Sequence, residues 1–253
     1  ISMRGATNFA DEAWWGFDIR AAVEDRLGLP VIYNNDGNAA ALYAHHRHFG
    51  AVAGERSSAA AIVGTGLGGG IIHEGRMVRG AAGMAGELGH VQIPTETLLA
   101  DGQPTPRCNC GFTGDAESFA SLTGIRNNLL PYWLAQYPDH ELHDVDIADA
   151  ATAVRSLGER GDEMALKIFE QQAAALGRLF TIVSNVVDPD VYFIGGGVLE
   201  AAPHFREWFL TRVRHHTDLR AEQADVAAIL EVTDLDMAGC RGAAVAALSA
   251  LGH

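Results

Sequence analysis

The stretch "SSAAAIVGTGLGGGIIHEGRMVRG", residues 57–80, decides the fold class. An apolar run leads into a glycine turn, a second apolar run follows, and Glu74-Gly75 marks a tight turn before a third, short run. The pattern predicts three consecutive strands. The glycines also match G-x-G-x-x-G at Gly64, Gly66 and Gly69. That dinucleotide fingerprint requires a helix to follow, and because a strand is predicted there, a Rossmann domain is excluded.

Helical and strand-like patterns alternate on both sides of this stretch. Helices are predicted over 17–28, 36–50, 146–161 and 162–189, and a helix interrupted at Pro131 over 126–138. "PVIYN", residues 30–34, predicts a short buried strand. Residues 190–216 predict a strand, a glycine turn and a helix, and a strand over 228–232 and a helix over 241–251 follow. This alternation indicates a layered α/β fold.

Composition narrows the function classes. The 253 residues are 48% hydrophobic and carry a formal net charge of −14, which argues against binding to nucleic acid or anionic membranes. No apolar run reaches the roughly 18 residues of a membrane helix, no signal peptide is visible, and three cysteines do not suggest a disulfide framework. We expect a soluble cytoplasmic protein. The only lysine, Lys167, lies in a predicted helix, which excludes a Walker P-loop.

Two glycine turns are candidates for nucleotide binding. Without Cβ atoms, residues 64–70 allow backbone N–H groups to approach an anion closely. The alternative is a glycine-rich hairpin that binds nothing. Residues 195–197 join a strand to a helix, which is where α/β proteins place ligands. Two such turns in one chain favour a nucleotide.

Asp36 follows the predicted strand 30–34 and has Asn34 and Asn35 beside it. In this position it could be a general base that accepts a hydroxyl proton. The alternative is that Asp36 caps the helix over 36–50, since aspartate and asparagine are preferred caps. The histidines at the end of that helix, within residues 45–48, are predicted to be solvated.

The stretch "RCNCGFTGDAE", residues 107–117, contains Cys108, Cys110 and Asp115, and His90 lies upstream in "GELGH". Two thiolates, an imidazole and a carboxylate are ligands that zinc accepts. Redox pairs normally have C-x-x-C spacing, so the C-x-C spacing argues against redox chemistry. Coincidence is the alternative to a metal site.

The motifs "NNDGNAAA", "GTGLGGGI", "GAAGMAGELGH", "CNCGFTGDAE" and "DPDVYFIGGGV", in this order, resemble the ROK family of bacterial sugar kinases and sugar-responsive repressors. The resemblance covers almost the whole chain. It implies an actin/hexokinase-like (ribonuclease H-like) α/β fold of two lobes, with the small lobe incomplete. Residues 1–35 would be the remnant of the small N-terminal lobe, 36–238 the large lobe, and 239–253 a C-terminal helix that returns to the small lobe. A homodimer is the family expectation.

The resemblance also implies roles for individual residues. Asp36 corresponds to the catalytic base, which removes a proton from a sugar hydroxyl, usually O6. The side chains that would bind the sugar are Asn35, Asp36, Glu87, His90 and Glu117. The glycine turns would hold ATP, delivered with Mg²⁺, through Gly64, Thr65, Gly66 and Gly68 at the phosphates and Gly195, Gly196 and Gly197 at the adenosine. His90, Cys108 and Cys110 correspond to ligands of a structural zinc ion.

Three features depart from the family pattern. Asp115 stands where the family has a third cysteine. Its oxygen can complete a Cys₂-His-Asp zinc site, and the alternative is a metal shell left open to water. The loop between His90 and Cys108 is longer than usual. No D-x-G-x-T phosphate motif occurs, and the chain opens about where the family's small lobe ends, so an N-terminal segment is either absent from this sequence or lost naturally. The prediction is therefore an ATP-dependent kinase of a hexose or N-acetylhexosamine. The alternative is a catalytically impaired sugar-binding or regulatory module.

Overall fold

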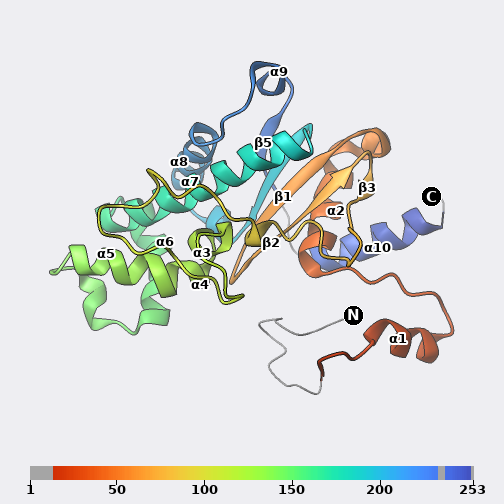
Figure 1. Ribbon diagram of the computed structural model, residues 1–253, viewed down its shortest axis with the longest axis horizontal. Helices are drawn as coiled ribbons and strands as arrows, with labels where there is room; N and C mark the ends of the chain where they lie inside the picture. The colour runs from red at the N-terminus through yellow and green to blue at the C-terminus, as the bar shows by residue number, and fades with distance from the viewer. Residues whose placement is uncertain (1–13, 233–236, 252–253) are drawn as a thin grey trace.

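The computed structural model describes residues 14–232 and 237–251, and its centre is a five-stranded sheet in the order β3-β2-β1-β4-β5 (Figure 1). The strands are β1 (Ser58–Val63), β2 (Leu67–His73), β3 (Arg76–Met77), β4 (Val191–Gly196) and β5 (Ala228–Glu231). The first three pair antiparallel, and β4 is parallel to both β1 and β5. Glu74 and Gly75 take φ of 48° and 70° at the β2–β3 turn. The predicted strand triplet and the α/β class are confirmed.

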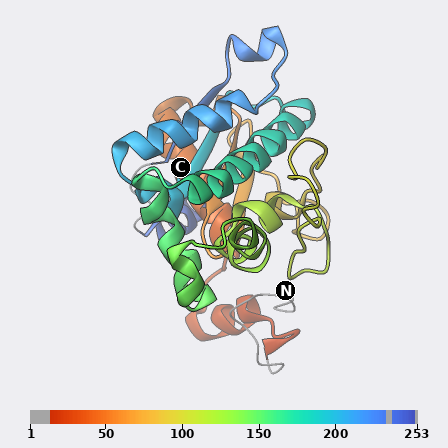
Figure 2. The same cartoon turned by 90° about the vertical axis from the view of Figure 1, so that its left-hand side faces the viewer.

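One face of the sheet is covered by α3 (Ala116–Ala120), α7 (Glu163–Val186) and α8 (Pro203–His215), with α6 (Ile147–Glu159) packed against α7 (Figures 1 and 2). Alternate strand residues point to this side, as the period of two requires. Ala59 and Ala61 of β1 and Tyr192 and Ile194 of β4 all belong to the largest apolar cluster. The main core therefore lies between the sheet and α7.

The opposite face is covered by α2 (Asp36–Phe49), and α10 (Ala238–Ala250) packs on α2 (Figure 1). Ala60 and Phe193 point to this side and form a smaller cluster with residues of α2. The packing is close because glycines meet there. A Cβ atom at Gly37 would lie 2.7 Å from the backbone nitrogen of Gly69, and one at Gly242 would overlap the carbonyl oxygen of Ala39.

The remaining elements are short. Helix α1 (Ile19–Leu27) lies apart from the sheet in both views and ends at Gly28, as predicted (Figures 1 and 2). The others are α4 (Leu122–Gly124), a π-turn (Ile125–Leu129), α5 (Leu130–Gln136), α9 (Ala221–Ala224) and the 3₁₀ turns η2 (Gly50–Glu55), η3 (Leu88–His90), η5 (Glu141–Asp144) and η6 (Gly197–Glu200). Among the described residues, no helix has both the length and the apolar character needed to cross a bilayer.

Pro131 lies in the first turn of α5, directly after the π-turn Ile125–Leu129, so the predicted helix changes from π to α geometry beside this proline. Two local predictions are wrong. Residues 30–34 form no strand, and the Val31 N–H is instead bonded to the Glu24 carboxylate at 3.0 Å. His45 is fully buried rather than solvated. Its Nε2 donates to the Ala53 carbonyl, and its Nδ1 accepts from the Ser58 hydroxyl, both at 2.8 Å.

Candidate functional site

The two glycine turns lie side by side at the carboxyl ends of two neighbouring parallel strands, β1 and β4. In the parallel pairing of β1 and β4, Val63 is opposite Gly196, so Gly64 and Gly197 begin adjacent turns at the carboxyl ends of the two strands. Gly196 has φ of 99°, and a Cβ atom there would overlap the Val63 carbonyl oxygen. Only glycine allows this approach. The structure thus brings together the two predicted nucleotide segments at the position where α/β sheets bind ligands.

The β1–β2 turn is held through its carbonyl groups. The Gly64 N–H donates to the Gly66 carbonyl at 2.9 Å. The N–H groups of Leu122 and Thr123, in the first turn of α4, donate to the carbonyls of Gly64 and Thr65 at 3.0 and 3.1 Å. The bonds from Leu122 and Thr123 direct the Gly64 and Thr65 carbonyl oxygens toward α4 and fix the path of the turn.

The N-terminus of α2 assembles three of the predicted sugar ligands. Asn35, not Asp36, caps the helix, because its Oδ1 accepts from the Asn38 N–H at 2.7 Å. Its Nδ2 donates to Glu87 Oε1 at 2.7 Å. Asp36 is the first helical residue, and its Oδ1 accepts the Gly37 N–H at 2.8 Å. Asp36 is therefore not needed as a cap. The capping role, which was the alternative to a general base for Asp36, belongs to Asn35.

Glu117, in the first turn of α3, connects the hairpin with the cysteine loop. Its Oε2 accepts the Leu67 N–H at 2.8 Å, and its Oε1 accepts from Cys108 Sγ at 3.3 Å. A Cβ atom at Gly66 would lie 2.8 Å from Glu117 Oε2, so a larger residue there would displace this carboxylate from its present position. The side chain predicted to bind sugar thus touches both the candidate phosphate turn and the candidate metal centre.

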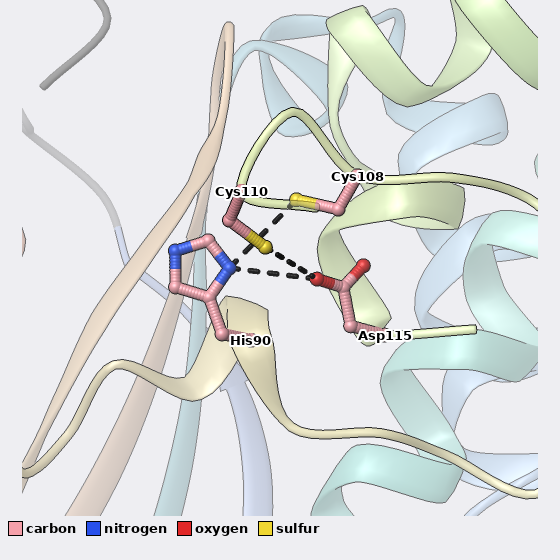
Figure 3. Close-up of side chains that lie close together, drawn as sticks. All are labelled: His90, Cys108, Cys110 and Asp115. Atoms are coloured by element: carbon pink, nitrogen blue, oxygen red, sulfur yellow. Dashed lines mark hydrogen bonds and ion pairs between the residues drawn. The ribbon is translucent and has the colours of Figure 1, made fainter. Parts of the chain in front are cut away.

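His90, Cys108, Cys110 and Asp115 converge, with their ligand atoms within 4.8 Å of one another (Figure 3). His90 Nδ1 lies 3.4 Å from Asp115 Oδ2 and 3.8 Å from Cys108 Sγ, and Cys110 Sγ lies 3.6 Å from Asp115 Oδ2. Ligands 2.0–2.3 Å from a tetrahedral zinc ion are separated by about 3.3–3.8 Å. The donor set and these three separations therefore fit a zinc site, with Asp115 as the fourth candidate ligand.

Short backbone pairings hold the metal cluster together. Gln92 pairs with Asp115 and Arg107 with Thr113 as isolated bridges, and the Cys108 N–H donates to the Phe112 carbonyl at 2.9 Å. Asp115 is fully buried, and its second oxygen, Oδ1, accepts the Ser118 N–H at 2.9 Å as the N-cap of α3. One carboxylate thus caps a helix and faces the cluster.

The cluster is electrostatically coupled. A hydrogen bond to the Asp115 carboxylate raises the pKa of His90 to about 9. Burial opposes ionisation of Asp115, but the hydrogen bonds from His90, Cys108 and Ser118 outweigh it and hold the carboxyl pKa below its ordinary value. Burial raises the pKa of the Cys108 thiol. His90 and Cys108 therefore hold protons that a zinc ion would displace.

The sequence did not reveal several supporting residues. Arg155 Nη1 donates to the Gly197 carbonyl at 2.6 Å and lies 3.7 Å from Glu200, which braces the second glycine turn. Arg178 and Gln171 bind the long loop 91–107. Their partners are more than 40 residues away, so no local pattern could identify them. Two surface hollows, one beside β3 and one between α2 and β5, are lined by none of the predicted site residues.

Comparisons with known proteins agree with this arrangement. The ROK family model matches residues 2–250. A glucokinase of Halalkalibacterium halodurans is 34% identical over 82% of this chain and 63% of its own length. An N-acetylmannosamine kinase of Citrobacter koseri is 34% identical over 79% of this chain and 59% of its own length. The chain thus spans about three fifths of the length of these curated relatives.

Solved structures show the same fold. A ROK hexokinase from Thermus thermophilus superposes with a TM-score of 0.71 at 31% identity, covering 94% of this chain and 72% of that one. A ROK family glucokinase from Streptomyces griseus, in complex with glucose and AMPPNP, gives 0.69 at 28% identity, covering 92% and 73%. A ROK family transcriptional regulator, described as a homolog of the E. coli MLC protein, gives 0.63 at 26%, covering 89% and 54%. The predicted actin/hexokinase-like fold is confirmed by the hexokinase and the glucokinase.

Proposed function

The chain belongs to the ROK family, and on that premise we propose that it carries the sugar- and nucleotide-binding lobe of an ATP-dependent sugar kinase. The substrate class is a hexose or an N-acetylhexosamine, phosphorylated at a hydroxyl group, O6 in our proposal. Relatives named as glucokinase and N-acetylmannosamine kinase, and a neighbour solved with glucose and AMPPNP, support this class. In this proposal residues 36–238 form the large lobe, 1–35 belong to the small lobe, and 239–253 return toward it.

The observation that carries the proposal is the convergence of Asn35, Asp36 and Glu87. Asn35 caps α2 and binds Glu87, which leaves the Asp36 carboxylate to act as a general base toward a sugar hydroxyl. The α2 backbone packs against Gly68 and Gly69, so this base lies beside the candidate phosphate hairpin. Phosphoryl transfer depends mainly on positioning and on neutralising charge. Mg²⁺ bound with ATP would supply the charge neutralisation.

We propose that His90, Cys108, Cys110 and Asp115 hold a structural zinc ion. Its chemical contribution would be to fix ligand geometry rather than to polarise substrate. Glu117 contacts Cys108 directly, and His90 is itself a ligand, so an ordered cluster would set the position of both predicted sugar-binding side chains. Zinc content of protein purified without chelators tests this point. Less than about half an equivalent would reject a stable site.

A coupled assay of ADP release, run on the full-length protein across a panel of hexoses and N-acetylhexosamines, tests the kinase proposal. The Asp36→Asn variant removes the base but keeps the size of the side chain. We expect kcat to fall by about 10²- to 10⁴-fold while sugar binding, measured by calorimetry, is retained. The proposal would be overturned if folded wild-type protein released no ADP with every sugar of the panel.

The second candidate is a sugar-binding or regulatory module that does not transfer phosphate. One observation favours it: a ROK family transcriptional regulator is among the structural neighbours. This candidate predicts sugar binding that ATP does not change and no ADP release. Tight ATP binding to the wild-type protein, lost on substitution in residues 64–68, would count against it.

A further inference from the structure

The loop 91–107, which joins two of the proposed zinc ligands, is held against helix α7 rather than left free (Figure 1). Arg178 of α7 makes the first attachment. Its Nη1 donates to the carbonyls of Pro94 and, at 2.8 Å, Glu96, and its Nη2 donates to Thr97 Oγ1 at 3.0 Å. All three acceptors lie in residues 94–97. A planar guanidinium can serve several acceptors in a fixed geometry, which a lysine cannot do.

Gln171 makes the second attachment, two helical turns earlier on the same side of α7. Its Nε2 donates to the Leu98 carbonyl at 2.9 Å, and its amide exchanges hydrogen bonds with the buried Gln103 at 2.6 and 3.2 Å. Trp133 Nε1 donates to Gln171 Oε1 at 2.9 Å and fixes the orientation of that amide. The loop is therefore anchored at two points along one rigid helix.

Helix α7 also contacts the segment that carries the fourth proposed ligand. Gln172 donates to the Ala120 carbonyl at the end of α3, whose N-cap is Asp115. Consequently α7 holds both the chain between His90 and Cys108 and the helix that begins at Asp115. The relative placement of the four ligands depends on this one helix.

The loop is strained where Arg178 binds it. Thr97 has φ of 61°, a left-handed conformation that is rare for a β-branched residue. Such a conformation persists only where surrounding contacts impose it. The contacts from Arg178 to Glu96 and to Thr97 itself flank the strained position.

We infer that Arg178 is a positioning residue for the proposed zinc centre: by holding residues 94–97 in a strained conformation, it fixes the path of the chain between His90 and Cys108. This inference rests on the proposed zinc site. It does not make Arg178 a ligand, and Arg178 touches none of the four cluster residues in the contacts that the described chain shows. Its effect should therefore be visible in how fast the metal leaves.

The test measures transfer of zinc from the loaded full-length protein to an excess of a chromophoric chelator. We expect Arg178→Gln to release zinc about tenfold faster than wild type, the lower end of the effect seen when residues supporting metal ligands are lost. The matched control is Arg212→Gln, which removes another hydrogen-bonded arginine on the α7 side of the sheet without touching the loop. This control should release zinc at the wild-type rate.

A rescue variant separates positioning from general stability. Glycine adopts positive φ without strain. Adding Thr97→Gly to the Arg178→Gln variant should therefore bring its rate of zinc release most of the way back to the slow wild-type rate. The inference would be overturned if Arg178→Gln released zinc at the wild-type rate, or if Arg212→Gln released zinc as fast as Arg178→Gln. The zinc proposal would stand in either case. If wild-type protein holds no zinc, the zinc proposal fails instead. Amide exchange at Leu98 and Leu99, expected to quicken in Arg178→Gln, then decides whether Arg178 holds the loop.

Discussion

Asp115 shows how one side chain can serve two purposes in this protein. One carboxylate oxygen caps α3 through the Ser118 N–H, and the other faces His90 and Cys110. A thiolate could not accept the capping hydrogen bond as well as a carboxylate does. The aspartate thus combines a helix cap with a proposed metal ligand whose oxygen is a harder donor than sulfur.

Substitutions at Asp115 should separate these two roles. Asn is also a good cap, so Asp115→Asn should keep the capping bond to Ser118, lose the ion pair with His90, and weaken zinc binding by about 10- to 100-fold. Asp115→Ala should lose zinc binding to a similar extent and destabilise the metal-free protein by about a further 1 kcal/mol. Zinc titration and urea denaturation of both variants measure the two effects. Equal zinc affinity in Asp115→Asn and wild type would contradict the assignment of Asp115 as a ligand.

The sequence indicated which candidate residues come together better than it indicated the residues that support them. The pattern around Asn35 and Asp36 located the start of α2, but it could not say which of the two caps the helix. That choice depends on Glu87, which is 52 positions away and bonds the Asn35 amide. Arg178 is the extreme case, since its acceptors lie more than 80 residues upstream. Local patterns specify elements and motifs, whereas only the tertiary fold specifies which distant groups hold them.

At the scale of elements, the contact between α2 and α10 depends on glycine. Gly242 of α10 faces the α2 backbone, and a Cβ atom there would overlap the Ala39 carbonyl oxygen. Gly239, one turn earlier in the same helix, has open space around its Cβ position. The two glycines therefore form a matched pair within one helix.

We expect Gly242→Ala to lower the free energy of unfolding by about 1 to 3 kcal/mol, because the two helices must separate to admit the methyl group. Gly239→Ala should instead be neutral or stabilise by up to about 1 kcal/mol, since alanine favours helix and nothing opposes it. Chemical denaturation of both variants provides the measurement. A loss of stability at position 239 as large as that at 242 would show that the close contact is not the cause.

Element prediction failed where pairing mattered. The apolar residues 30–34 have the composition of a strand, yet they form none, because β-structure needs a neighbouring strand and the described chain provides none there. In contrast, residues 57–80 form their own partners through short turns, so their pattern was sufficient. The order of β4 and β5 beside β1 comes from packing against α7 and α8.

At the scale of the whole molecule, the acid side of the stability profile should depend on Glu170. Burial opposes its ionisation, but Arg212, bound at 2.6 and 2.7 Å, and His216, at 2.7 Å, hold its pKa below the ordinary 4.5. A depressed carboxyl pKa means that the unfolded chain binds more protons than the folded one. The stabilisation is therefore complete above about pH 4.5 and is lost as pH falls through the lower, folded pKa.

Glu170→Gln should reduce stability near neutral pH by up to about 1 kcal/mol, a modest value because the side chain is 34% exposed. Its stability should also fall less steeply than that of wild type below about pH 4.5. Thermal melts from about pH 3 to 7 measure the difference, with Glu222→Gln on the exposed helix α9 as the control. Parallel profiles for wild type and Glu170→Gln would contradict the prediction.

The position of Glu117 has a consequence for sequence change. Its two oxygens touch the hairpin and the cysteine loop at once, so no substitution there can alter one without altering the other. In a mutational scan we would expect this position to tolerate almost no replacement, even glutamine. Changes in sugar preference would then have to arise in segments that Glu117 does not contact. An engineer who seeks a new substrate should vary those segments first.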